Sequence, residues 1–264
     1  MAWNLTASGT QAMDNSNPVT MAFDCNGADL LVVAVCVSAG SVYDKIPTYN
    51  SVSMTDCGEG LVSSGSESNV YIFYLVNPSS GSNTISLENT ATKNVTFYAS
   101  AWTGVDTSDP LDTAASDHDV SADPSVTITT SAAGKLILDI CMDGYINSFS
   151  GNSHTLINSQ DHGSQNTGNQ YTTLDGSSGI TLSWTCGSDD WAMIVAAFNQ
   201  VHLPNRDNLL TMDYSKDGRP FVRVGTNASV LLDGMDVSYE GRPFWGPEGG
   251  EEEEEERKRI YLVL

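Results

Sequence analysis

Basic residues are nearly absent from most of this 264-residue chain. Before residue 200 the only basic residues are Lys45, Lys93 and Lys135, against twenty aspartates and glutamates, and the formal net charge is −22. A surface of this sign repels phosphate and anionic lipid, so we expect neither direct nucleic-acid binding nor adhesion to a membrane. Strong acidity keeps a particle-surface or extracellular protein dissolved.

Long apolar runs are missing as well. No stretch approaches the ~20 apolar residues that a transmembrane helix needs. The start, Met-Ala-Trp-Asn-Leu-Thr, has no basic region followed by an apolar one. We therefore predict neither a transmembrane segment nor a signal peptide, and if the protein works outside a cell, we expect it to leave by assembly or lysis.

The motifs of common enzymes and cofactor sites are also absent. The four histidines have no metal-ligand spacing, and there is no Gly-x-Ser-x-Gly elbow, P-loop or dinucleotide fingerprint. The five cysteines lack a C-x-x-C pair, so no zinc ribbon is expected, although a Cys25–Cys57 bridge stays open. The sequence predicts a protein that is not an enzyme and has no cofactor.

Calcium is the one metal that the sequence leaves open. Asp106, Asp109 and Asp112 lie close together in a polar stretch, and calcium prefers hard oxygen ligands from loops. No EF-hand spacing surrounds them. The bland alternative is a set of solvated acids in a long acidic connection, which we place at residues 104–124.

The most informative stretch that is present covers residues 29–37, Asp-Leu-Leu-Val-Val-Ala-Val-Cys-Val. Its length and β-branched content predict a strand that is buried on both faces. Such a strand needs two covers, and therefore a second sheet or a partner subunit.

Short strand-like runs recur along the chain with turn residues between them and almost no helical periodicity. They predict an all-β fold, an antiparallel β-sandwich or jelly-roll body over residues 1–200, followed by an extended, β-rich C-terminal repeat segment. Residues 30–36 correspond to residues 136–141, so two similar halves, about 1–110 and 120–200, are an alternative. One sandwich is favoured because neither half alone offers a convincing full set of strands.

The composition changes after residue 200. Residues 212–221 return as residues 235–244 with seven of ten positions identical, so residues 201–247 contain a true repeat. Two such short units cannot enclose a core, and we interpret them as a docking segment. Residues 248–264 are an acidic linker and an apolar terminal strand, which could pair with a sheet edge of a neighbour or of the body.

Three segments carry a family resemblance: residues 29–35, residues 74–85 and residues 101–110 (Ala-Trp-Thr-Gly-Val-Asp-Thr-Ser-Asp-Pro). Together they resemble a β-sandwich domain of virion proteins of tailed phages and of some bacterial surface proteins. The Gly-Arg-Pro-Phe units resemble the short C-terminal repeats of phage structural proteins. The resemblance implies a capsid decoration or tail/fibre-type subunit with no catalytic residues, whose partners are its own copies and other virion proteins.

In this interpretation the C-terminal segment makes the contacts with neighbours. Aromatic anchors and arginines dominate such interfaces. The expected partner-binding residues are Arg219, Phe221, Arg242, Phe244, Trp245, Tyr261 and Leu264. The alternatives are a carbohydrate-binding or host-adhesion module with a glycan partner, and a self-assembling extracellular filament subunit.

Overall fold

The chain divides into two compact units, Met1–Val201 and His202–Leu264. The computed structural model describes most of the first unit and short strands of the second. The described residues are 3–38, 45–61, 68–90, 92–121, 123–131, 134–143, 149–161, 166–174, 179–187, 189–201, 211–214, 220–224, 228–231, 238–239, 242–243 and 260–261.

The first unit is built from antiparallel strands, and no helix occurs among the residues that the structure describes. The strands of its first half are β1 (Asn4–Asp14), β2 (Val19–Asp24), β3 (Leu30–Ser38), β4 (Thr48–Tyr49), β5 (Val52–Ser53), β6 (Thr55–Leu61), β7 (Ser68–Val76), β8 (Ser82–Leu87) and β9 (Asn94–Thr103). The strands of its second half are β10 (Leu111–Ser121), β11 (Ser125–Thr129), β12 (Lys135–Asp143), β13 (Gly151–Asn152), β14 (Thr155–Asp161), β15 (Asn166–Leu174), β16 (Gly179–Thr185) and β17 (Asp189–Asn199).

The two halves have the same strand order. The large sheets are β1-β9-β3-β7-β6 and β10-β17-β12-β15-β14, and the small sheets are β2-β8-β4-β5 and β11-β16-β13. Each half therefore holds a complete pair of sheets, although the sequence favoured a single sandwich. The halves looked incomplete because β4, β5 and β13 are two residues long, too short to leave a periodic pattern.

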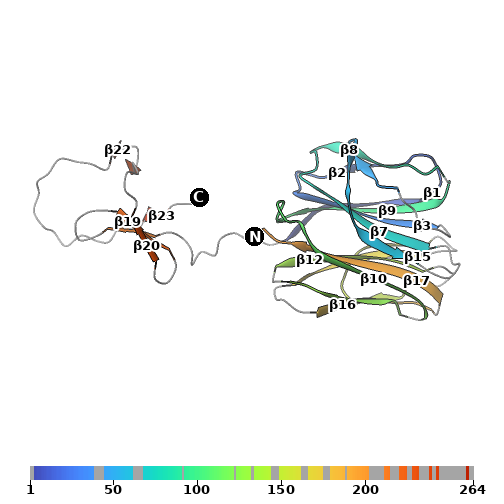
Figure 1. The fold of residues 1–264 in the computed structure, drawn as a ribbon. Helices are drawn as coiled ribbons and strands as arrows, with labels where there is room; N and C mark the ends of the chain where they lie inside the picture. The colour runs from blue at the N-terminus through green and yellow to red at the C-terminus, as the bar shows by residue number, and fades with distance from the viewer. Residues whose placement is uncertain are drawn as a thin grey trace, which may run out of the picture. The chain divides into compact units, whose positions relative to one another are not determined.

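The four sheets lie in layers, with the large sheets in the middle and the small sheets outside (Figure 1). One core fills the space between the two sheets of the first half, and another fills the corresponding space in the second half. A third core lies between the two large sheets and joins the halves. Both large sheets are therefore covered on both faces.

Strand β3 shows why the sequence is so apolar there. Leu31, Val33 and Val35 belong to the first-half core, whereas the alternate residues Leu30 and Val32 belong to the central core. The prediction of a strand buried on both faces is confirmed, and its second cover is the other half of the same chain. Strand β12 is the equivalent strand of the second half and is buried along its whole length.

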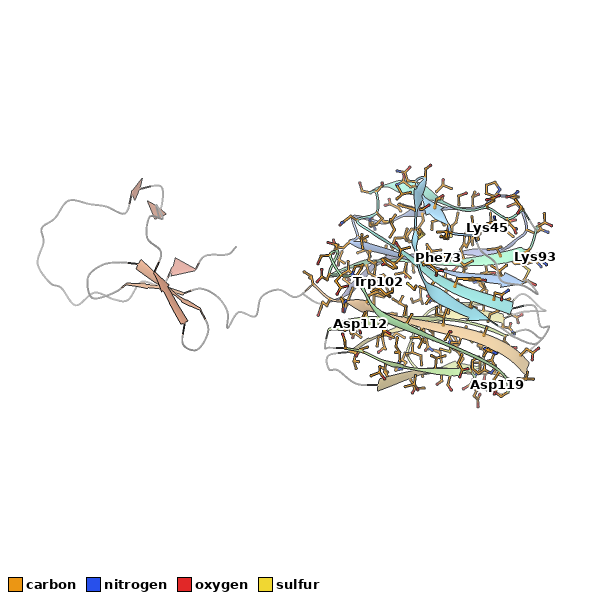
Figure 2. The ribbon with its side chains drawn as sticks, viewed as in Figure 1. Lys45, Phe73, Lys93, Trp102, Asp112 and Asp119 are labelled. Carbon is orange, nitrogen blue, oxygen red and sulfur yellow. The ribbon has the colours of Figure 1, made fainter. Side chains whose placement is uncertain are left out.

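Aromatic residues link the two halves through the central core. The rings of Trp102 and Tyr171 pack edge to face with their centroids 4.8 Å apart, and those of Tyr74 and Phe198 do so with their centroids 5.7 Å apart. The hydroxyl of the buried Tyr98 contacts the main-chain carbonyl of Thr167 across the same boundary, at 3.1 Å. Figure 2 shows Trp102 and Phe73 inside the layers, while Lys45, Lys93 and Asp119 lie at the periphery.

The prediction of an acidic connecting segment at residues 104–124 is mostly wrong. Residues Leu111–Ser121 form the edge strand β10, which pairs along its length with β17. Its outer part is exposed and polar, including Asp117 and His118. The exposed part of an edge strand has no buried face that would require apolar and polar residues to alternate, so its sequence looks like that of a loop.

The described part of the second unit is also β-structure. Its strands are β18 (Thr211–Tyr214), β19 (Pro220–Val224), β20 (Ala228–Leu231), β21 (Ser238–Tyr239), β22 (Arg242–Pro243) and β23 (Ile260–Tyr261). They form an antiparallel sheet in the order β20-β19-β18-β23 and a separate β21-β22 pair. Among the described residues of the whole chain, no helix has the length and apolarity needed to cross a bilayer.

Candidate functional site

The predicted docking residues fall in the second unit. Phe221 lies in β19 opposite Leu231, and Arg242 lies in β22 opposite Tyr239. Tyr261 lies in β23, which pairs with β18 of the same unit and forms an edge of that sheet. Arg219, Phe244, Trp245 and Leu264 lie outside the described residues.

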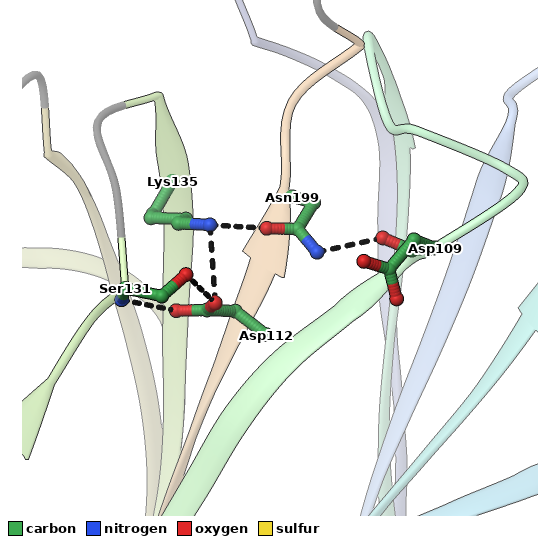
Figure 3. Close-up of polar contacts among 5 residues, drawn as sticks. All are labelled: Asp109, Asp112, Ser131, Lys135 and Asn199. Carbon is green, nitrogen blue, oxygen red and sulfur yellow. Dashed lines mark hydrogen bonds and ion pairs between the residues drawn. The ribbon is translucent and has the colours of Figure 1, made fainter.

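A group of buried polar side chains marks the point where the chain leaves the first unit. Lys135 opens β12, Asn199 ends β17, and the two residues are direct cross-strand partners. Asp112 comes from β10, which pairs with the other edge of β17. Three adjacent strands of one sheet thus bring an amine, a carboxamide and a carboxylate together (Figure 3).

These groups are connected by short polar contacts. The Lys135 ammonium lies 3.2 Å from Asp112 Oδ1 and also donates a hydrogen bond to Asn199 Oδ1. Asn199 Nδ2 donates to the main-chain carbonyl of Asp109 at 2.7 Å, so the carboxamide lies between Lys135 and Asp109 (Figure 3). Ser131 donates to Asp112 from its main-chain N–H, at 3.0 Å, and from its hydroxyl.

The charged pair is shielded from water. Only 4% of the Lys135 side chain and 6% of the Asp112 side chain are exposed. Burial acts to raise the pKa of the Asp112 carboxyl, but the hydrogen bonds from Ser131 and the contact with Lys135 outweigh it, so this pKa lies below its ordinary value. Asp112 is therefore a carboxylate beside a buried amine at neutral pH.

A β-bulge aims Asp112 at this place. The pairing of β10 with β17 shifts between Leu111 and Thr113, which leaves Asp112 as the extra residue. A bulge bends its strand and turns one side chain away from the regular alternation. The first half has the same irregularity at Thr6, between Leu5 and Ala7, so the bulge is part of the shared architecture.

The carboxylates suggested for calcium do not gather into a site. Asp106 accepts hydrogen bonds from Ser108 within its own turn, and Asp112 faces Lys135. Within the ranges that the structure describes, no three His, Cys, Asp or Glu side chains lie close enough together to hold a metal ion.

A second buried carboxyl, Asp139, lies in the middle of β12. Its two oxygens accept hydrogen bonds from the Gln170 main-chain N–H at 3.0 Å, the Gln170 side-chain amide at 2.7 Å and Trp184 Nε1 at 3.1 Å. Complete burial outweighs these contacts and raises the pKa of Asp139 to about 7. The equivalent position of the first half is the apolar Val33, so this cluster is particular to the second half.

The three tryptophans of the body's predicted strands offer no surface for stacking on sugar rings. Trp102, Trp184 and Trp191 are buried in the cores, as strand positions normally are. Cys36 and Cys141 are small core residues as well, while Cys25 and Cys57 belong to different cores and are not bridged. These positions provide neither a carbohydrate platform nor a disulfide.

Neither the Lys135 group nor Asp139 was predicted from the sequence. A signal was present in both cases: a charged residue opens the apolar run 135–142, and another interrupts it. Charged residues are rarely buried without a partner, so each one in such a run points to a polar site inside the fold. The partners are far away in sequence, and only the strand pairing identifies them.

A comparison of the chain with protein families, with curated proteins and with solved structures finds no match.

Proposed function

We propose that the protein is a non-enzymatic structural subunit of a phage particle, of the capsid-decoration or tail/fibre type, which assembles through its C-terminal segment. The observation that carries the proposal is the division of the chain into a self-contained β body and a small second unit of short strands. The body has its own cores, whereas the second unit contains the repeated Gly-Arg-Pro-Phe sequence.

The strand order of the body supports a particle role. In each half the chain crosses several times between a large and a small sheet, and the first and last strands, β1 and β9 or β10 and β17, are neighbours in the large sheet. The same neighbour relation is found in jelly rolls, a fold common in viral capsid proteins, although here β6 and β14 join the large sheet. We propose that the body is a tandem of two such units.

The distribution of charge supports surface exposure. Several acidic side chains of the body are exposed, among them Asp117 and Asp119 on the edge strand β10 and Asp109 and Asp123 in loops, where water and other copies would meet them. Like-charged bodies repel one another, so association has to come from a less acidic part of the chain. The repeat segment offers arginines and aromatic residues, which are typical anchors of protein interfaces.

The proposal is tested by removing the two repeat phenylalanines. The double variant Phe221→Ala/Phe244→Ala is expected to sediment as a smaller species than the wild-type chain, with an unchanged near-ultraviolet spectrum of the body. The matched control is Val120→Ala/Leu156→Ala, which removes exposed apolar side chains from the body (62% and 46% exposed) and is expected to leave association intact. Equal association of both variants and the wild type would contradict the proposed role of the repeats.

A further inference from the structure

The Asp112, Lys135 and Asn199 group has the composition and placement of a reactive site. An amine, a carboxamide and a carboxylate meet in a shielded place, and the amine contacts both of the other groups. We propose that Lys135 and Asn199 become joined by an isopeptide bond that the folded chain forms by itself, with Asp112 transferring the protons. The product would be a covalent link between β12 and β17.

The reaction balances without any outside reagent. Asp112 takes one proton from the Lys135 ammonium, and the neutral amine attacks Cγ of Asn199. The carboxamide nitrogen then takes up two protons, one from the attacking amine and one from Asp112, and leaves as ammonium, so that the chain becomes lighter by one ammonia molecule. One C–N bond forms, one C–N bond breaks, and Asp112 ends as the carboxylate with which it began.

The geometry fits each step. The hydrogen bond from the Lys135 amine to Asn199 Oδ1 holds the nucleophile beside the carbonyl carbon and polarises the carbonyl group. Asp112 Oδ1, 3.2 Å from the amine, is within reach for proton transfer. The hydrogen bond of Asn199 Nδ2 to the Asp109 carbonyl fixes the leaving nitrogen on the opposite side of the carboxamide (Figure 3).

The first half shows that the fold does not need these three residues. Leu30 pairs with Trp102 as Leu136 pairs with Phe198, so the position of Lys135 corresponds to Asp29 and that of Asn199 to Thr103. The bulge position of Asp112 corresponds to Thr6.

The first-half residues make ordinary contacts that close the same end of the sheet. Thr6 donates to main-chain carbonyls, including that of Ala101 at 3.1 Å, and Asp29 accepts from the Gly104 N–H at 2.8 Å. The second half therefore has a nucleophile, the Lys135 amine, and an electrophile, the Asn199 carboxamide, that this end of the sheet does not need in order to fold.

A buried ion pair kept for stability is the plain alternative. Such pairs often contribute little, because removing two charges from water costs about as much as their attraction returns. A covalent bond here would hold β17 to β12 close to the end of the body, because the first unit ends at Val201, two residues after Asn199.

The test is the intact mass of the purified full chain after denaturation. We expect the wild type to be lighter than its sequence by one ammonia molecule, and Lys135→Arg, Asn199→Ala and Asp112→Asn each to have the mass of their sequence. Trypsin cleaves after arginine and after lysine, but not after a lysine whose amine is acylated. Residues 94–206 of the denatured wild type should therefore stay in one fragment, whereas Asp112→Asn should be cut after Lys135. Fragmentation after a second protease should place the link between Lys135 and Asn199.

Two results would overturn the proposal. The first is a wild-type chain with the full mass of its sequence, a measurement that depends on no variant folding correctly. The second is a missing ammonia that persists in Lys135→Arg, because cyclisation at the Asn26-Gly27 pair also releases ammonia and needs no lysine. Asp112→Asn keeps both joined residues, so a cross-link that still forms there would remove Asp112 from the mechanism.

Discussion

Asp139 makes the stability of the body depend on pH in an unusual direction. Its carboxyl is completely buried in the second half, and its pKa is raised from 3.8 to about 7. In the unfolded chain the same carboxyl loses its proton near the ordinary value. Between these two pKa values the folded state binds one more proton than the unfolded state, so the free energy of unfolding falls as the pH rises.

The size of the effect follows from the pKa difference. Each pKa unit corresponds to about 1.4 kcal/mol, so roughly 2–3 kcal/mol of stability is lost between about pH 5 and about pH 8. The lower pH of the comparison is set near 5 because the isoelectric point is about 4.1, where the chain carries no net charge to keep it dissolved.

The assay is urea unfolding of the wild type and of Asp139→Asn at both pH values. The asparagine cannot ionise, and the loss of one acceptor opposite Gln170 and Trp184 costs a similar amount at each pH. The wild type should therefore exceed the variant by roughly 2–3 kcal/mol more at about pH 5 than at about pH 8. An equal difference at both pH values would show that Asp139 is already ionised in the folded protein, held by its three donors.

Two further substitutions test contacts inside the body, one beside Trp184 and one between the two halves. A Cβ atom on Gly168 would lie 2.5 Å from the Trp184 ring, so Gly168→Ala should destabilise the body by about 1–3 kcal/mol in urea unfolding. The control is Gly179→Ala, whose Cβ would come no closer than 3.7 Å to any neighbour and which should change little. Tyr98→Phe removes the hydroxyl that contacts Thr167 between the halves and should cost about 1 kcal/mol. Full stability of that variant in thermal unfolding would show that the buried hydroxyl contributes nothing.

The sequence predicts the central strands well because their pattern depends on burial. Residues 29–37 and 135–142 are apolar on both faces, and the structure places them in the middle of the two large sheets, as β3 and β12. The exposed edge strand β10 is the opposite case. Neither of its faces is fully buried, so its polar sequence does not distinguish a strand from a loop.

The reactive group could not be found from the sequence for a different reason. Lys135 and Asn199 are 64 positions apart, and Asp112 is 23 positions before the lysine, with no spacing that a motif could reveal. Their meeting depends on the pairing of β12, β17 and β10 and on one bulge. The calcium hypothesis shows the converse case, since Asp106 and Asp112 are close in sequence while their carboxylates face different partners, Ser108 and Lys135.

The proposal that the body folds alone and the C-terminal segment carries assembly is tested most directly by the mass in solution. Light scattering would compare the full chain with a chain that ends at residue 204. We expect the full chain to form a defined oligomer or polymer, and the shortened chain to be a folded monomer that unfolds cooperatively. A shortened chain that is unfolded, or one that forms the same oligomer as the full chain, would contradict the proposed division of roles.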